Sequence, residues 1–265
     1  MVSFTRKDHY RIEDLMEILR LLRGEGGCPW DREQTHQSIR MAFIEETYEA
    51  VEAIDTNDIG LMREELGNVL LQVAFHCQLE REQGSFTFDD VCDEVCKKLI
   101  HRHPHVFGEL ELSDTEAVLK NWDKIKQETK QQSDSDTLTA VSKALPALMR
   151  AQKVGKRAMR AGMDFDSPQD AFDCVTQEAA ELQEAMGSGS REQMEEELGD
   201  LLFSCVNTAR HLQIDAEEAL TRATEKFIRR FQKTEELLKQ EGIEMQSLGI
   251  KELDVYWRRA KEAIR

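Results

Sequence analysis

The sequence of 265 residues has few residues that interrupt helices and lacks the long apolar runs that cross membranes. Its four prolines and fourteen glycines fall between segments with helical periodicity. No apolar run approaches the roughly 18 residues that span a bilayer. The first residues, MVSFTRKD, lack the apolar core of a signal peptide. We therefore expect a cytoplasmic protein without a membrane partner.

Basic residues are also scarce. Lysine and arginine total 35 against 52 aspartates and glutamates, which gives a net charge of −17. A protein that holds a nucleic-acid backbone needs a basic surface, so we expect no nucleic-acid partner. With 40% hydrophobic and 33% charged residues, the composition is that of a folded chain with real cores.

The six cysteines form no CxxC pair and no dense framework. In a long chain without a secretion signal, this usage favours reduced thiols. The alternative is a zinc site from Cys92, Cys96, His101 and His103, but their spacing fits no common zinc pattern.

The periodicity predicts an all-α fold, because strand-like alternation persists nowhere. A glycine-rich loop is expected at 24–36, and the polar segment 128–139 is typical of a linker. The predicted organisation is an N-terminal domain at 1–128, a linker at 129–142 and a C-terminal domain at 143–265. The predicted helices are 12–23, 38–55, 58–82, 89–102, 115–127, 146–161, 168–186, 191–212, 216–241 and 251–264.

The two halves repeat four features in the same order, which indicates a duplicated domain. Glu178 follows Glu46, and Glu197 follows Glu65, by the same 132 positions. The four pairs of features are Glu46–Glu49 and Glu178–Glu181, Glu65–Asn68 and Glu197–Asp200, Lys98–Arg102 and Lys226–Arg230, and Trp122–Lys126 and Trp257–Lys261.

Acidic residues spaced three apart lie on one helix face, as Glu178 and Glu181 do, and as Glu197 and Asp200 do. If the two helices pack antiparallel, the four carboxylates converge and repel one another. A hard divalent cation such as Mg²⁺ or Mn²⁺ relieves that repulsion and completes its shell with substrate phosphates. The pattern suggests a metal-dependent phosphate enzyme. The alternative is a solvated acidic face.

Basic residues further along are spaced as a phosphate clamp. Lys226 and Arg230 share a helix face and suit a polyphosphate. Trp257 and Lys261 form a second face, on which an indole stacks on a base while the amine reaches phosphate. The alternatives are pairing of the cations with neighbouring acids and burial of the tryptophan in the core.

The helix predicted at 191–212 has an apolar stripe, which is expected to be its buried side. Asp200 lies nearly opposite this stripe. A second surface, such as that of another subunit, would then cover the acidic face. The stripe consists of Leu198, Leu201, Leu202, Cys205 and Ala209.

These motifs resemble a known family. Glu-Glu-x-x-Glu followed by Glu-x-x-Asp resembles the signature of all-α nucleoside triphosphate pyrophosphohydrolases. The segments GCPWD at 27–31 and HRHPHVF at 101–107, with the two-copy length, resemble the MazG family. The resemblance implies tandem helical-bundle domains, a homodimer, and Mg²⁺-dependent cleavage of nucleoside triphosphates between the α and β phosphates. The products would be a monophosphate and pyrophosphate, and both canonical and damaged nucleotides would be accepted.

The resemblance also assigns residues by position. Asn68 stands where the family has aspartate, and Gln177 replaces the first glutamate of the C-terminal motif. The N-terminal site is therefore the doubtful one. The implied metal ligands are Glu178, Glu181, Glu197 and Asp200, with Glu46, Glu49 and Glu65 in the N-terminal copy. The implied nucleotide and phosphate contacts are Lys226, Arg230, Trp257 and Lys261.

In the expected mechanism, metal-bound hydroxide attacks the α phosphorus and the cations stabilise the leaving pyrophosphate. Glu196 is a candidate base that orients the water. The alternatives are an enzyme restricted to aberrant nucleotides and a regulatory scaffold that binds nucleotides without hydrolysis. A di-iron bundle is disfavoured, since it needs two Glu-x-x-His motifs and only Glu33 with His36 has that spacing.

Overall fold

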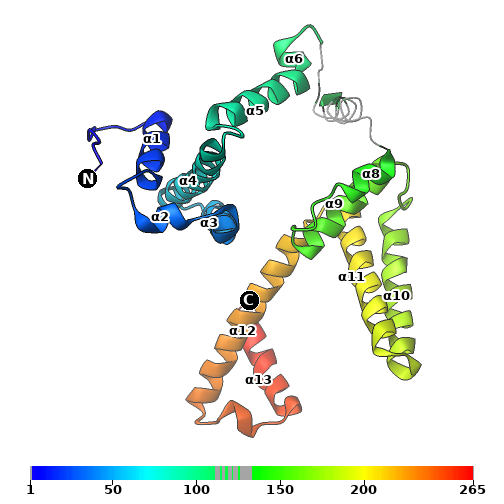
Figure 1. Cartoon of the computed structure of the whole chain (residues 1–265). Helices are drawn as coiled ribbons and strands as arrows, with labels where there is room; N and C mark the ends of the chain where they lie inside the picture. Colours follow the sequence, from blue (N-terminus) through cyan, green and yellow to red (C-terminus); the bar gives the residue numbers. More distant parts are fainter. Residues whose placement is uncertain are drawn as a thin grey trace. The chain divides into compact units, whose positions relative to one another are not determined.

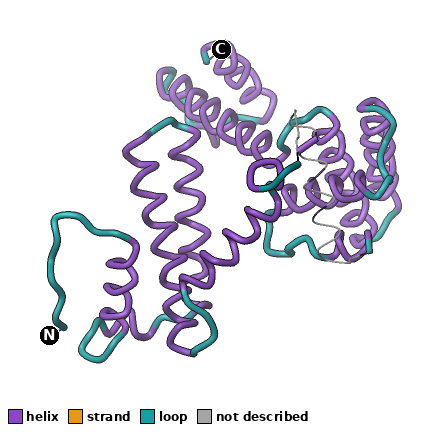
Figure 2. Tube along the Cα trace, turned by 90° about the horizontal axis from the view of Figure 1, so that it is seen from above, coloured by secondary structure: helices purple, strands orange, loops and turns teal. Residues whose placement is uncertain are grey.

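The computed structural model describes residues 2–110 and 133–264, together with 114, 117, 118, 121 and 125. All regular structure in these described residues is helical, which confirms the all-α prediction (Figures 1 and 2). The chain divides into two compact units, Met1–Thr129 and Lys130–Arg265. None of the described helices is long and apolar enough to span a bilayer.

Unit 1 is built on an antiparallel helical hairpin. Helix α4 returns along α3, α1 packs on α4, and Leu19 of α1 and Phe75 of α4 lie in the buried core. The Arg23 guanidinium lies 5.4 Å from the centroid of the Phe75 ring. Its Nε and Nη2 each donate a hydrogen bond of 2.8 Å to a different carboxylate oxygen of Glu82. The helices of unit 1 are α1 (Ile12–Arg23), α2 (Pro29–Glu33), α3 (His36–Asp55), α4 (Ile59–Gln83), α5 (Phe88–Arg102) and α6 (Pro104–Phe107).

Unit 2 contains two hairpins, α10–α11 and α12–α13, which diverge from α9 (Figure 1). Helix α9 packs against both α11 and α12. The elements of unit 2 are α8 (Asp134–Thr139), α9 (Ala147–Arg160), α10 (Pro168–Ser188), α11 (Arg191–His211), α12 (Ala216–Gln240), η1 (Met245–Ser247) and α13 (Ile250–Ala263).

Helix α9 is tied to its neighbours by polar side chains. The buried Gln152 donates to the Ile214 carbonyl at 2.9 Å and accepts from the Ala216 amide at 3.0 Å. A Cβ at Gly155 would lie 2.7 Å from Asn207 Oδ1, so glycine permits the close approach of α9 and α11. These contacts hold the C-terminal part of α11 and the start of α12 against α9.

Another polar anchor lies between α9 and the end of α11. Asp164 accepts from Arg210 Nη1 at 3.0 Å and contacts His211 Nε2 at 2.9 Å. Chiefly the hydrogen bond from Arg210 lowers the pKa of Asp164 to about 2. The turn before α10 is thus held to α11.

The longer helices agree with the sequence prediction to within two residues. Ser190 accepts from the Gln193 amide, which confirms the predicted cap of α11. The short helices were missed. Helix α2 falls in the expected loop and begins with Pro29, whose fixed φ suits a first helical position. The predicted helix 115–127, with Trp122 and Lys126, lies mostly outside the described residues.

The expected linker is helical in its second half, where α8 forms. Ser133 caps this helix, Arg157 of α9 donates to the Thr137 carbonyl, and the following Val141 is buried. Composition predicted an unstructured segment, but these tertiary contacts fold it against α9.

Two histidines close the open end of the α3–α4 hairpin. His36 Nδ1 lies 2.6 Å from His76 Nδ1, and His36 Nε2 lies 2.6 Å from Glu80 Oε1. The imidazoles stack with centroids 4.9 Å apart, and Phe43 packs on His76. Burial, followed by the charge of His36, lowers the pKa of His76 from its usual 6.5.

Acidification should therefore destabilise unit 1. The pKa of His76 is lower in the folded chain than in the unfolded chain, so below about pH 6.5 the unfolded chain binds more protons. The free energy of unfolding therefore decreases as the pH falls below that value. Thermal unfolding between about pH 8 and pH 5.5 should show this loss. His76→Gln should weaken the pH dependence, whereas the matched change of exposed His9 to glutamine should preserve it. An unchanged slope in His76→Gln would contradict the assignment.

Candidate active site: two clusters of carboxylates

The α10–α11 hairpin brings three predicted acidic residues together. Glu178 and Glu181 of α10 and Glu197 of α11 each place a carboxylate oxygen within 4.8 Å of the others. Glu178 and Glu197 are half-buried. Oxygen atoms at this spacing, on two rigid helices, suit a hard divalent cation.

Asp200 lies one turn beyond Glu197, outside this triplet, but its charge acts on it. Burial, followed by the charges of Glu181 and Asp200, raises the pKa of Glu178. Burial again comes first for Glu197, whose pKa is raised further by Glu181, Glu178, Glu196 and Asp200. The cluster therefore favours added positive charge, whether as protons or as a cation.

Gln177 contributes in a way that the sequence did not reveal. Its Nε2 donates to Glu181 Oε1 at 2.8 Å, so it orients one carboxylate of the cluster. In the sequence it is only the departure from the Glu-Glu-x-x-Glu motif. The amide adds no charge to a crowded site.

The α3–α4 hairpin carries the corresponding cluster of unit 1. Carboxylate oxygens of Glu46, Glu49 and Glu65 also lie within 4.8 Å of one another. Glu65 is only 7% exposed, and Asn68 Nδ2 donates to its Oε2 at 2.9 Å. Burial chiefly raises the pKa of Glu46, while a hydrogen bond with Asn68 lowers it. Asn68 thus relieves repulsion that a cation would otherwise relieve.

The predicted phosphate clamp lies on the other hairpin of unit 2. Lys226 and Lys261 are exposed, whereas Arg230 is half-buried and its Nε is enclosed without a hydrogen-bond partner. The Trp257 ring packs against Phe227, with centroids 4.9 Å apart. Because the two hairpins diverge, the chain does not bring its own clamp to its carboxylates (Figure 1).

The apolar stripe of α11 was predicted to be buried, which is wrong for Leu198, Leu202 and Cys205, whereas Leu201 and Ala209 are half-buried. Leu198 and Leu202 are 46% and 50% exposed, and Cys205 is exposed. The α10–α11 packing instead half-buries Glu197, which belongs to the charged face. The surface left to cover is therefore this stripe, and the corresponding Leu66 and Leu70 of α4 are also exposed.

The two alternative metal sites are not assembled among the described residues. The groups of three or more clustered His, Cys, Asp or Glu side chains there are the two glutamate triplets, and the cysteine–histidine set is not one of them. Glu33 ends α2, while His36 turns to His76 and Glu80, so the Glu-x-x-His spacing builds no metal pair.

A family model for the MazG nucleotide pyrophosphohydrolase domain matches residues 34–107 and again 166–234. The chain belongs to the MazG family. Each match contains one glutamate triplet, and the second also contains Lys226 and Arg230, whereas Trp257 and Lys261 lie beyond it. The duplicated architecture read from the sequence is thereby confirmed.

Curated MazG-type relatives match nearly the whole chain. A Thermotoga maritima protein named nucleoside triphosphate pyrophosphohydrolase/pyrophosphatase MazG is 43% identical over 94% of this chain and 95% of its own. An Escherichia coli nucleoside triphosphate pyrophosphohydrolase is 40% identical over 95% of this chain and 97% of its own. Bacillus subtilis YabN, named as an uncharacterized protein, is 43% identical over 97% of this chain and 53% of its own.

Asn68→Asp should destabilise the protein in the absence of divalent cations. The change removes the donor to buried Glu65 and adds a negative charge, which should cost about 1–3 kcal/mol of unfolding free energy. Chemical denaturation in a chelator measures this cost, and an added divalent cation should recover part of it.

Gln37→Glu is the matched control, since it adds one charge at an exposed position of the same hairpin. Its stability should stay within about 0.5 kcal/mol of the parent. Equal stability of Asn68→Asp and the parent without cations would show that Asn68 does not relieve the cluster.

Proposed function

We propose that this chain is a nucleoside triphosphate pyrophosphohydrolase that releases nucleoside monophosphate and pyrophosphate. The main support is the glutamate triplet of α10–α11, whose carboxylate oxygens lie within 4.8 Å of one another. The triplet lies inside a segment that matches the MazG family model. The names of the Thermotoga and Escherichia relatives support the reaction class. Nucleoside triphosphates of broad base identity are the proposed substrates.

Magnesium is the proposed cofactor, with Mn²⁺ as a substitute. Glu178, Glu181 and Glu197 would hold it, and Asp200 one turn on would complete an all-oxygen set. The donor chemistry fits, because the oxygens converge, and burial followed by mutual repulsion raises the pKa values of Glu178 and Glu197. When bound, the ion would activate a water and neutralise substrate phosphates.

The side chains of this chain supply the remaining roles. Lys226, Arg230 and Lys261 would bind the β and γ phosphates and stabilise charge on the leaving pyrophosphate. Trp257, braced by Phe227, would stack on the base. Exposed Glu196, next to the triplet, is the proposed residue that orients the attacking water.

Assembly as a homodimer would complete the site. Each chain separates its carboxylates from its clamp, and leaves an apolar stripe on α11 uncovered. A second copy that covers Leu198 and Leu202 removes that surface from water and adds helices around the glutamates. The site would then form only between subunits.

The N-terminal copy is proposed to serve structure more than turnover. Its buried Glu65 is already held by Asn68, so the cluster is partly neutralised without a metal. We propose the cytosol as the compartment, which suits the six free cysteines. Domains at 1–128 and 143–265 remain our proposed boundaries.

Turnover should depend on the C-terminal cluster. Glu197→Gln or Asp200→Asn should lower hydrolysis by at least about a hundredfold, because each removes a metal-ligand charge, whereas Glu65→Gln should lower it less than about threefold. Pyrophosphate and orthophosphate are measured separately at saturating Mg²⁺, with circular dichroism as the folding control. Loss of activity in Glu65→Gln with retention in Glu197→Gln would place the working site in the other half. Orthophosphate as the released product would overturn the reaction class.

Disrupting the α11 stripe should separate the subunits. Leu202→Asp places a charge in the proposed interface, and should yield monomers with at least about tenfold lower turnover. Met163→Asp is the control, because Met163 is 80% exposed in the turn after α9. Analytical ultracentrifugation gives the mass of each variant. A parent protein that sediments as a fully active monomer would exclude the arrangement.

A further inference from the structure

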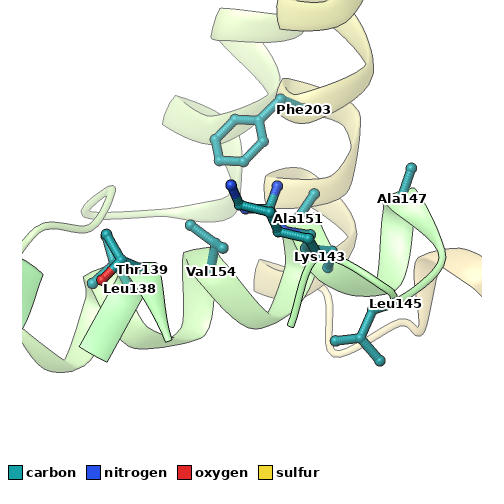
Figure 3. A pocket seen from close by; sticks show the side chains of 9 residues that line it. Leu138, Thr139, Lys143, Leu145, Ala147, Ala151, Val154 and Phe203 are labelled. Atoms are coloured by element: carbon teal, nitrogen blue, oxygen red, sulfur yellow. The ribbon is translucent and has the colours of Figure 1, made fainter. Parts of the chain in front are cut away.

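Unit 2 contains a cavity away from the glutamate triplet. Its volume is about 510 Å³. It is lined by residues of α9, of α11, and of the end of α8 with the segment that joins α8 to α9 (Figure 3). Its volume falls in the range of small-molecule pockets, roughly 300–1,000 Å³. Phe203 projects from α11 on one side, and Leu138, Ala151 and Val154 line the other (Figure 3).

Two cations line this mostly apolar cavity. Neither Lys143 nor Arg150 makes an ion pair or a side-chain hydrogen bond with any described residue, although the chain carries a net charge of −17. Arg150 Nε is enclosed by the protein and lacks a hydrogen-bond partner. A buried donor without a partner costs free energy, so a ligand that accepts a hydrogen bond from Arg150 would stabilise this site.

The cavity is separate from the carboxylates although both use α11. Glu197 faces the glutamates of α10, whereas Phe203 reaches the side of α11 next to α9. Phe203 also lies well around the helix from the exposed Leu198 and Leu202, so the proposed dimer face and the cavity differ. A ligand could occupy the cavity without displacing metal or subunit.

We propose that this cavity is a second binding site for a nucleoside monophosphate. The base stacks on Phe203 against the aliphatic wall, and the phosphate binds Arg150 and Lys143. A phosphate monoester carries about −1.5 to −2 charges at pH 7, which matches two cations. Inorganic phosphate alone would leave the aromatic wall empty, and a nucleoside alone would leave Arg150 unpartnered. The site thus rests on the proposed function for its ligand, which is the product of that hydrolysis.

The test is calorimetric titration of the full chain with AMP in a chelator, which removes metal-dependent binding at the glutamates. Arg150→Gln and Lys143→Gln should each weaken AMP binding roughly tenfold or more, because each removes a charged phosphate contact. Arg150→Gln removes a buried donor that has no partner, and Lys143 is exposed, so both variants should fold. Circular dichroism checks this.

Matched variants and ligands decide the outcome. Lys153→Gln removes an exposed cation of α9 outside the cavity, and Glu197→Gln disables the glutamate triplet; both should bind AMP as the parent does. Adenosine and inorganic phosphate should each bind at least about tenfold more weakly than AMP. Absence of AMP binding to the parent, or unchanged AMP binding in Arg150→Gln and Lys143→Gln, would overturn the proposal. Pyrophosphate release is assayed separately, so failure of the proposed reaction is distinguishable from failure of this site.

Discussion

Repulsion between carboxylates on facing helices is the constraint around which both units are organised. Each hairpin brings three glutamates within 4.8 Å, a spacing that costs free energy until positive charge or hydrogen bonds compensate it. In unit 1 the buried Glu65 accepts a hydrogen bond from Asn68, which compensates part of the repulsion. In unit 2 Glu181 accepts a hydrogen bond from Gln177. Both clusters still contain carboxylates with raised pKa values, Glu46 in unit 1 and Glu178 and Glu197 in unit 2.

The hairpin geometry links chemistry to assembly. When α10 packs on the side of α11 that carries Glu197, the leucine stripe is turned to solvent. Burying the acids thus exposes the apolar residues, and the same exchange occurs at Leu66 and Leu70 of α4. The exposure of Leu198 and Leu202 thus follows from the packing that half-buries Glu197.

The sequence predicted the long helices and the duplication well, because periodicity and caps such as Ser190 are local signals. It missed α2 and α8, since short helices depend on tertiary contacts such as that of Arg157 with Thr137. It also mistook the buried side of α11. Periodicity tells which residues share a face, but the partner helix decides which face is covered. Likewise, Asn68 was read as a missing ligand, while its role as a donor depends on where Glu65 points.

Gln152 gives unit 2 a mechanical property. Its amide bonds to Ile214 in the connection between α11 and α12 and to Ala216 at the start of α12, so α9 holds the point from which the two hairpins diverge. Because both hairpins are long and contact α9, a small change in the tilt of α9 would move the far ends of the hairpins by a much larger distance. The packing of α9 against α11 and α12 therefore bears directly on how far apart the two hairpins lie.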